Sequence, residues 1–162
     1  MRFAIAAAAT LFGAAIAAPA PQASPAPAPN PKETVLLSKF KAFHQLVEGP
    51  VNEVSFVIST HKEVGVAAYV CSAVSQQAPL ALKPTTFNCA GGVPEKDIYR
   101  FQVNEVDTAA NTYNMTIYHQ TAPAYGLWGE IKLDTTCRPE GVRSEYCEHQ
   151  DNVEVELHTF GP

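Results

Sequence analysis

The sequence lacks the short motifs that mark the most common catalytic and metal centres. It contains neither His-Glu-x-x-His, which sets two zinc ligands on one helix face, nor Gly-x-Ser-x-Gly, which presents the nucleophile of many hydrolases. It also has no Cys-x-x-Cys pair, the usual thiolate spacing of a structural zinc site. These absences remove the most specific sequence signals for an enzyme or a zinc module, and we expect no cofactor.

Positive charge is scarce as well. The 162 residues hold 11 Lys and Arg against 16 Asp and Glu, which gives a formal net charge of -5 with neutral histidines. Binding to phosphate backbones requires a basic field that such a chain does not have. We therefore expect no nucleic-acid partner.

Long apolar runs are missing except at the start of the chain. Arg2 is followed by an uncharged, apolar stretch over residues 3–17, the pattern of a secretory signal peptide. The small residues Ala15 and Ala17 fit the cleavage site, so we place the signal peptide at residues 1–17. The run is shorter than the roughly twenty residues of a membrane-spanning helix, so we expect a secreted, extracellular protein without a membrane anchor.

Residues 18–31 are almost entirely Ala, Pro, Ser, Gln and Asn. This composition favours extended conformations and cannot build a core, so it predicts a disordered spacer. An O-glycosylated stalk or part of a pro-segment would have the same composition. The remaining residues, 32–162, are enough for one folded domain with its own core.

Apolar and polar residues alternate with a period of two in this domain, which is typical of β-strands with one buried face. Val54, Phe56 and Ile58 point one way, for example, and the same pattern recurs at 99–103, 113–117 and 153–157. Weaker alternation predicts further strands at 35–43, 65–72, 86–89 and 125–133. Because many short strands must hide their edges, we predict the all-β class, with a single antiparallel β-barrel or a closed sandwich.

An even number of cysteines lies in this domain: Cys71, Cys89, Cys137 and Cys147. In a secreted chain, such a set favours two disulfides over free thiols. Three connectivities are possible, and pairing in chain order is favoured because it closes the shortest loops and suits neighbouring strands. The competing interpretation is a zinc site formed by these thiolates with His149 or His158, which an oxidising compartment disfavours.

The surroundings of the cysteines resemble a known family. The segments that carry the resemblance are Val70-Cys71-Ser72-Ala73, Phe87-Asn88-Cys89, Tyr99-Arg100-Phe101, Cys137-Arg138, Tyr146-Cys147 and the alternating run 153–157. In their order and spacing they are similar to the Alternaria major-allergen family of secreted fungal proteins. The resemblance spans about residues 51–160.

This resemblance implies a fungal, disulfide-bonded β-barrel with the cysteines paired in chain order. Members act as allergens, elicitors and effectors, and are thought to bind host defence proteins or small apolar and phenolic ligands rather than to catalyse a reaction. Some members carry an additional upstream cysteine that links two subunits. This chain has no cysteine before Cys71, so we expect a monomer or a noncovalent dimer.

A few residues remain candidates for catalysis. Glu154 and Glu156 lie on the same face of a predicted strand and would resemble a glycosidase carboxylate pair, but alternating Glu also keeps an outer strand soluble. The pairs Ser144-Glu145 and Glu148-His149 could act as nucleophile and base, but such pairs arise by chance on the loops of almost any protein. None of these patterns is specific, and we predict no catalytic centre.

Three aromatic residues fall out of phase with their inward neighbours. If Ile117 and Leu127 face the core, Tyr118 and Trp128 face outward, and the Pro- and Gly-containing segment 121–126 displays Tyr125. Exposed aromatic clusters often serve as binding hot spots, although partial burial in the core is the plainer interpretation. We name Tyr118, Tyr125 and Trp128 as a candidate recognition surface.

Asn114-Met115-Thr116 fits the signal for N-glycosylation, and Asn114 alternates away from the apolar residues beside it. We therefore predict a glycan at Asn114. Together, these features favour a secreted effector or allergen-like protein that binds a host defence protein or a small ligand. The alternatives are a secreted hydrolase of wall polysaccharide or ester bonds, and a carrier with a small apolar ligand inside a partly empty barrel.

Overall fold

The computed structural model describes residues 31–60, 68–75, 78–91 and 98–159. The predicted signal peptide and all but the last residue of the predicted spacer lie outside the described residues. Within the described ranges every regular element is a β-strand, and no helix there is long and apolar enough to cross a bilayer. The predicted all-β class is confirmed.

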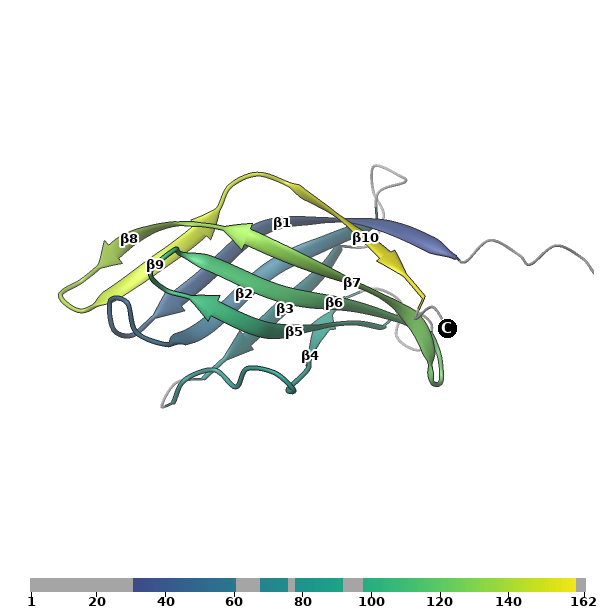
Figure 1. Ribbon diagram of the computed structural model, residues 1–162, viewed down its shortest axis with the longest axis horizontal. Helices are drawn as coiled ribbons and strands as arrows, with labels where there is room; N and C mark the ends of the chain where they lie inside the picture. Colours follow the sequence, from purple (N-terminus) through teal and green to yellow (C-terminus); the bar gives the residue numbers. More distant parts are fainter. Residues whose placement is uncertain (1–30, 61–67, 76–77, 92–97, 160–162) are drawn as a thin grey trace, which may run out of the picture.

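Ten strands follow one another along the chain: β1 (Lys32–His44), β2 (Val51–Thr60), β3 (Ala68–Val74), β4 (Phe87–Ala90), β5 (Ile98–Asp107), β6 (Thr112–Ala122), β7 (Tyr125–Asp134), β8 (Thr136–Glu140), β9 (Ser144–His149) and β10 (Val153–His158). β1 through β7 pair antiparallel in chain order, and β10 lies between β7 and β1. This last pairing closes an eight-stranded antiparallel barrel (Figure 1). The predicted barrel is therefore confirmed, in preference to the sandwich.

β1 changes partner along its length. Residues 32–37 pair with β10, whereas residues 40–44 pair with β9, which with β8 forms a hairpin that extends the sheet at the far end of the barrel (Figure 1). The change occurs at a bulge between Ser38 and Lys41, where Lys39 has a left-handed φ of 55°. The bulge bends the strand and lets one long element serve two partners.

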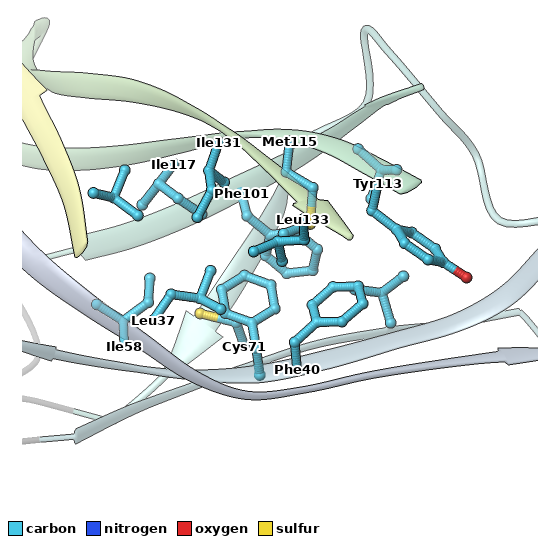
Figure 2. Packing of buried hydrophobic residues seen from close by; sticks show 14 of the residues in the cluster. Leu37, Phe40, Ile58, Cys71, Phe101, Tyr113, Met115, Ile117, Ile131 and Leu133 are labelled. Carbon is cyan, nitrogen blue, oxygen red and sulfur yellow. The ribbon is translucent and has the colours of Figure 1, made fainter. Parts of the chain in front are cut away.

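The barrel interior is filled by side chains. The residues predicted to face inward, among them Phe56 and Ile58 on β2, Phe101 on β5 and Ile117 on β6, are buried. Figure 2 shows core residues from separate strands pointing toward one another, with the rings of Phe40 and Tyr113 among them. Their ring centroids are 5.0 Å apart, within the range of favourable aromatic packing.

Both disulfides join neighbouring antiparallel strands. Cys71 on β3 lies opposite Cys89 on β4, and Cys137 on β8 lies opposite Cys147 on β9. The two bridges span 18 and 10 residues of chain, which is the pairing in chain order. No free cysteine remains among these four, so the zinc site proposed as the competing interpretation has no thiolate ligands.

The alternation of apolar and polar residues did not predict the hairpin of β8 and β9. The first of these strands contains Pro139, and the second buries Glu145 where alternation would require an apolar residue. Ser144-Glu145 and Glu148-His149 consequently lie on strand β9 and not on a loop. The predicted strands 65–72 and 86–89 correspond to β3 and β4, displaced toward the C-terminus by one or two residues at their described ends.

Candidate functional site

The candidate aromatic residues lie on β6 and β7, the long hairpin at one end of the barrel. Tyr118 on β6 lies directly opposite Trp128 on β7, and both point away from the core because their neighbours Ile117 and Leu127 are buried. Both rings are half-buried against the sheet. Trp128 also lies beside His158 of β10, with 5.1 Å between the ring centroids. An aromatic row therefore crosses the outside of three adjacent strands.

Tyr125 reaches solvent at the tip of the hairpin. Pro123 and Ala124 form the turn, and Ala124 adopts a left-handed φ of 59°. Such a turn brings Tyr125 back beside the end of β6, opposite Ala122. Its side chain is 52% exposed, which makes it one of the few large apolar side chains on the surface.

A concavity lies between this turn and the neighbouring strand β5. We call it the β6–β7 pocket; its volume is about 530 Å³, and it is lined by nine residues, Thr86, Arg100, Tyr118, His119, Gln120, Ala124, Tyr125, Gly126 and Leu127. A pocket of this size accommodates a small organic molecule. Two of the three predicted recognition residues thus line one pocket, and Trp128 lies beside it, opposite Tyr118.

Arg100 is a component of this site that sequence reasoning missed. It lies on β5 directly opposite Tyr118, with Asn88 of β4 on its other side. Among the described residues that line the pocket, it is the sole side chain with a permanent charge. Its Nε is buried and forms no hydrogen bond with a described residue.

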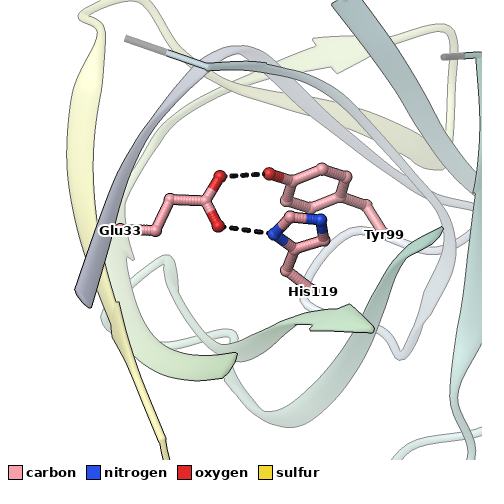
Figure 3. A network of polar contacts seen from close by, with 3 residues as sticks. All are labelled: Glu33, Tyr99 and His119. Atoms are coloured by element: carbon pink, nitrogen blue, oxygen red, sulfur yellow. Dashed lines mark hydrogen bonds and ion pairs between the residues drawn. The ribbon is translucent and has the colours of Figure 1, made fainter. Parts of the chain in front are cut away.

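A polar network lies directly behind the pocket, inside the barrel. The carboxylate of Glu33 on β1 accepts hydrogen bonds from the hydroxyl of Tyr99 and from Nδ1 of His119, each at 2.5 Å. Figure 3 shows Glu33 reaching across to these two rings, which are stacked with centroids 4.2 Å apart. His119 also lines the pocket, so it connects the pocket to the first strand.

The network keeps Glu33 ionised. Partial burial opposes ionisation, but the hydrogen bonds from His119 and Tyr99 and the charge of His119 outweigh it and hold the pKa of Glu33 below its usual value. An ionised carboxylate only accepts hydrogen bonds, so Nδ1 of His119 carries the proton in this contact. The arrangement fixes the orientation of the His119 ring behind the pocket.

Residues 37–150, which include both disulfides and the whole pocket, match the family model described as Alternaria alternata allergen 1. The chain belongs to this family. Effector protein PevD1 of Verticillium dahliae is 29% identical over 158 residues, which cover 96% of this chain and 92% of that protein. The resemblance identified from the order of the cysteines is therefore confirmed.

Two crystal structures of the Alternaria alternata major allergen Alt a 1 share the fold of this chain. Their TM-scores are 0.58 and 0.60 at 15% and 16% sequence identity. They cover 80% and 83% of this chain, and this chain covers 96% of each allergen chain. The barrel is thus the fold of the Alternaria allergen 1 family, and the pocket residues lie on strands of this fold and on the segments that join them.

In this family member a second polar network lies at the opposite end of the barrel. His44 donates from Nδ1 to the carbonyl of Gly49 at 2.6 Å, and its Nε2 accepts a hydrogen bond from the hydroxyl of Tyr113. Burial and the nearby carboxylate of Glu145 raise the pKa of Tyr113 well above its usual value, so its hydroxyl stays protonated and donates. This network closes the barrel end that faces the β8–β9 hairpin.

The same end brings His44, Glu145 and Cys147 within 4.8 Å of one another. Cys147 is bound to Cys137, both ring nitrogens of His44 are engaged, and Glu145 accepts a hydrogen bond from the backbone of Glu48. The cluster therefore has no thiolate or free imidazole nitrogen to offer a metal ion.

The remaining candidates are spread over the surface. Glu154 and Glu156 are both exposed on the outer face of β10, where Glu156 pairs with Lys32 of β1 at 2.5 Å. His149 donates from Nδ1 to the carbonyl of Asp134. Asn114 lies on the outer face of β6, away from buried Met115, and its glycosylation stays a prediction.

Proposed function

We propose that this member of the Alternaria allergen 1 family is a secreted, effector-like protein that acts by noncovalent recognition outside the cell. Its relative PevD1 is named an effector protein, and the family is named after an allergen. The predicted signal peptide at residues 1–17 supports export. The proposed partner is a host extracellular defence protein or a small apolar or phenolic ligand.

The observation that carries the proposal is the side-by-side placement of Tyr118 and Trp128 on the outer face of β6 and β7, with the exposed ring of Tyr125 lining the same pocket as Tyr118. Tyr and Trp supply large contact area at little cost in conformational entropy, and they are enriched among the residues that dominate binding energies. A rigid β-hairpin of the barrel holds them in place. The aromatic face is therefore preorganised for binding.

A carrier with its ligand inside the barrel would need space that the core side chains occupy. Buried rings of Phe40, Phe56 and Phe101 contact their neighbours across the interior. The β6–β7 pocket is open to solvent. If a small ligand binds, we place it there.

A hydrolase is the second candidate, and the Glu33–His119 pair is the observation that favours it. A carboxylate on Nδ1 orients an imidazole as a general base in many enzymes. In this chain the same carboxylate also binds Tyr99 and ties β1 to β5 and β6, which supports a structural role. Release of product from chromogenic esters or wall polysaccharide, abolished in His119→Ala, would favour the hydrolase.

The cysteines bear on whether a dimer of this protein could be covalent. All four are engaged in disulfides within the chain, so no thiol remains among them for a covalent dimer. We propose a monomer or a noncovalent dimer. Sedimentation equilibrium with and without reductant distinguishes these from a disulfide-linked pair.

The test is a quantitative capture experiment with the secreted protein. Wild type, the double variant Tyr118→Ala/Tyr125→Ala and the control Val142→Ala are immobilised and exposed to host extracellular fluid. Val142 is 99% exposed in the turn between β8 and β9, at the opposite end of the barrel. We expect wild type and the control to retain the same components and the double variant to lose them.

Equal retention by all three proteins, or no retention by any of them, would contradict the proposal. A reduced sample provides a further comparison. If the fold holds the recognition surface in place, retention of host components should fall when both disulfides are reduced. The double variant must keep the thermal transition of a folded barrel for the comparison to hold. Application of the same proteins to host tissue measures the defence response in parallel.

A further inference from the structure

The β6–β7 pocket combines aromatic walls with a single fixed positive charge. Tyr118 and Tyr125 flank it, Leu127 adds apolar surface, and Arg100 lies on β5 at its side. The volume of about 530 Å³ suits a molecule of one or two rings. The size and the walls together point to a small, partly apolar ligand.

The charge of Arg100 is not balanced within the described protein. None of the described residues that line the pocket is Asp or Glu, and Arg100 forms no ion pair with a described residue. The cross-strand neighbours of Arg100 are Asn88 and Tyr118, which are both uncharged. A lone cation of this kind is unexpected in a chain with 16 acidic and 11 basic residues.

The hydrogen-bonding capacity of Arg100 is also incompletely used. Its Nε is buried and has no hydrogen-bond partner among the described residues. A buried donor without a partner is costly, and nearly all such donors in folded proteins are paired. The described residues therefore leave part of the hydrogen-bonding capacity of the guanidinium unused.

The type of residue restricts the acceptor. The planar guanidinium of Arg presents parallel N–H groups that match the two oxygens of a carboxylate. A phenol or a neutral carbonyl offers only one oxygen and no charge. The aromatic walls and the guanidinium therefore favour different parts of the same ligand, its ring and its carboxylate.

We propose that the β6–β7 pocket binds a small aromatic carboxylate, with the carboxylate paired to Arg100 and the ring held between Tyr118 and Tyr125. This inference rests on the proposed recognition function of the same face and names the ligand class for it. The negative net charge of the chain opposes anion binding in general, so the local charge of Arg100 has to attract the carboxylate at the pocket. Binding then requires both a carboxylate for Arg100 and a ring that fits between Tyr118 and Tyr125.

The test uses benzoate as the probe and benzamide as its neutral isostere. Titrations of the full secreted protein are followed by the backbone amide and Trp128 indole signals in nuclear magnetic resonance. We expect saturable shifts at Gly126 and Trp128 with benzoate, and at least about tenfold weaker binding of benzamide, since a charged bidentate hydrogen bond is lost.

Variants separate the pocket from general anion binding. Arg100→Gln should weaken benzoate at least about tenfold and bring it close to benzamide. Arg138→Gln makes the same change of charge at an exposed site on β8 and should leave benzoate binding as in wild type. Unchanged signals outside β5 to β7 show that the Arg100→Gln variant is folded.

Three results would overturn the inference: no saturable binding of benzoate, equal affinity for benzoate and benzamide, or an Arg100→Gln variant that binds benzoate as wild type does. The proposed function fails separately, when the Tyr118→Ala/Tyr125→Ala variant captures host components as wild type does. A protein that passes the capture test but does not bind benzoate would keep its recognition face and lose only the ligand class.

Discussion

Glu33 and His119 are 86 residues apart in the chain, yet Oε2 of the carboxylate lies 2.5 Å from Nδ1 of the imidazole. Glu33 also accepts the hydroxyl of Tyr99, so one side chain of β1 connects to both β5 and β6 behind the pocket. The start of the first strand is thereby fixed against the strands that carry the aromatic face.

The first prediction concerns the pH dependence of this contact. Because the pKa of Glu33 is lowered in the folded protein, its stabilisation is present above the usual pKa of 4.5 and is lost as the pH falls through the folded pKa. Glu33→Gln should lower the free energy of unfolding by about 1.5–3 kcal/mol at pH 7, the range for hydrogen bonds to a charged group. The difference from wild type should shrink below about pH 4.5.

Urea unfolding at several pH values measures this difference. Glu130→Gln is the matched control, since Glu130 is exposed on β7. A Glu33→Gln variant whose deficit stayed constant down to pH 2.5, or one that matched Glu130→Gln at pH 7, would show that the ionised carboxylate does not stabilise the fold.

The second prediction concerns the unequal roles of the two disulfides. In the chain-entropy model the 18-residue loop of Cys71–Cys89 contributes about 3 kcal/mol and the 10-residue loop of Cys137–Cys147 slightly less. Cys71→Ala/Cys89→Ala should destabilise the barrel by at least this amount, because this bridge joins two strands of the closed barrel, β3 and β4.

The bridge Cys137–Cys147 joins β8 to β9, which lie outside the closed barrel. Its removal should fray the hairpin while the barrel keeps its cooperative transition. Chemical denaturation measures the cooperative transition of the barrel. Native-state hydrogen exchange compares β8–β9 with the barrel strands and reports fraying of the hairpin. Loss of the whole fold in Cys137→Ala/Cys147→Ala would contradict this division.

The third prediction concerns Lys39, whose φ of 55° lies in the left-handed region. A β-branched side chain is strained there, so Lys39→Val should cost about 1–2 kcal/mol of stability. Lys39→Gly should be neutral or slightly stabilising, because relief of strain offsets the entropy that glycine gains on unfolding. Thermal unfolding measures both variants.

Lys132→Val provides the comparison on an ordinary strand position of β7, where valine is favourable. If valine were tolerated equally at positions 39 and 132, the bulge would not depend on the left-handed residue. The change of partner along β1 would then need another explanation.

The fourth prediction is the glycan at Asn114. Protein secreted from a eukaryotic host should show a mass excess that peptide N-glycosidase removes and that Asn114→Gln abolishes. Asn114 faces outward on β6, so a glycan there has room without displacing buried Met115. An unchanged mass after enzyme treatment would show that the site is unused.

Alternation in the sequence was enough to predict the inward faces of the long strands. Phe56, Phe101 and Ile117 lie in the core as expected, because each belongs to a strand with one buried and one outward face. Glu145 broke the same rule. Its carboxylate is satisfied by the backbone N–H of Glu48, a contact with a loop that no periodicity reveals.

The candidate site was predictable only in part. Tyr118, Tyr125 and Trp128 were identified from their phase relative to Ile117 and Leu127, which is local information. Arg100 and Glu33 were missed, because their roles depend on register between strands and on contacts across the barrel. Only the register of β5, β6 and β7 places Arg100 beside Tyr118 and Tyr118 beside Trp128.

The central claim is that the outer face of β6 and β7 is the surface by which this protein recognises its partner. Hydrogen exchange of the secreted protein, with and without the host component that it captures, tests this claim most directly. The account predicts that protection on binding is concentrated in residues 118–128 and the facing part of β5. Protection centred on the β8–β9 hairpin around Val142, with residues 118–128 unchanged, would contradict it.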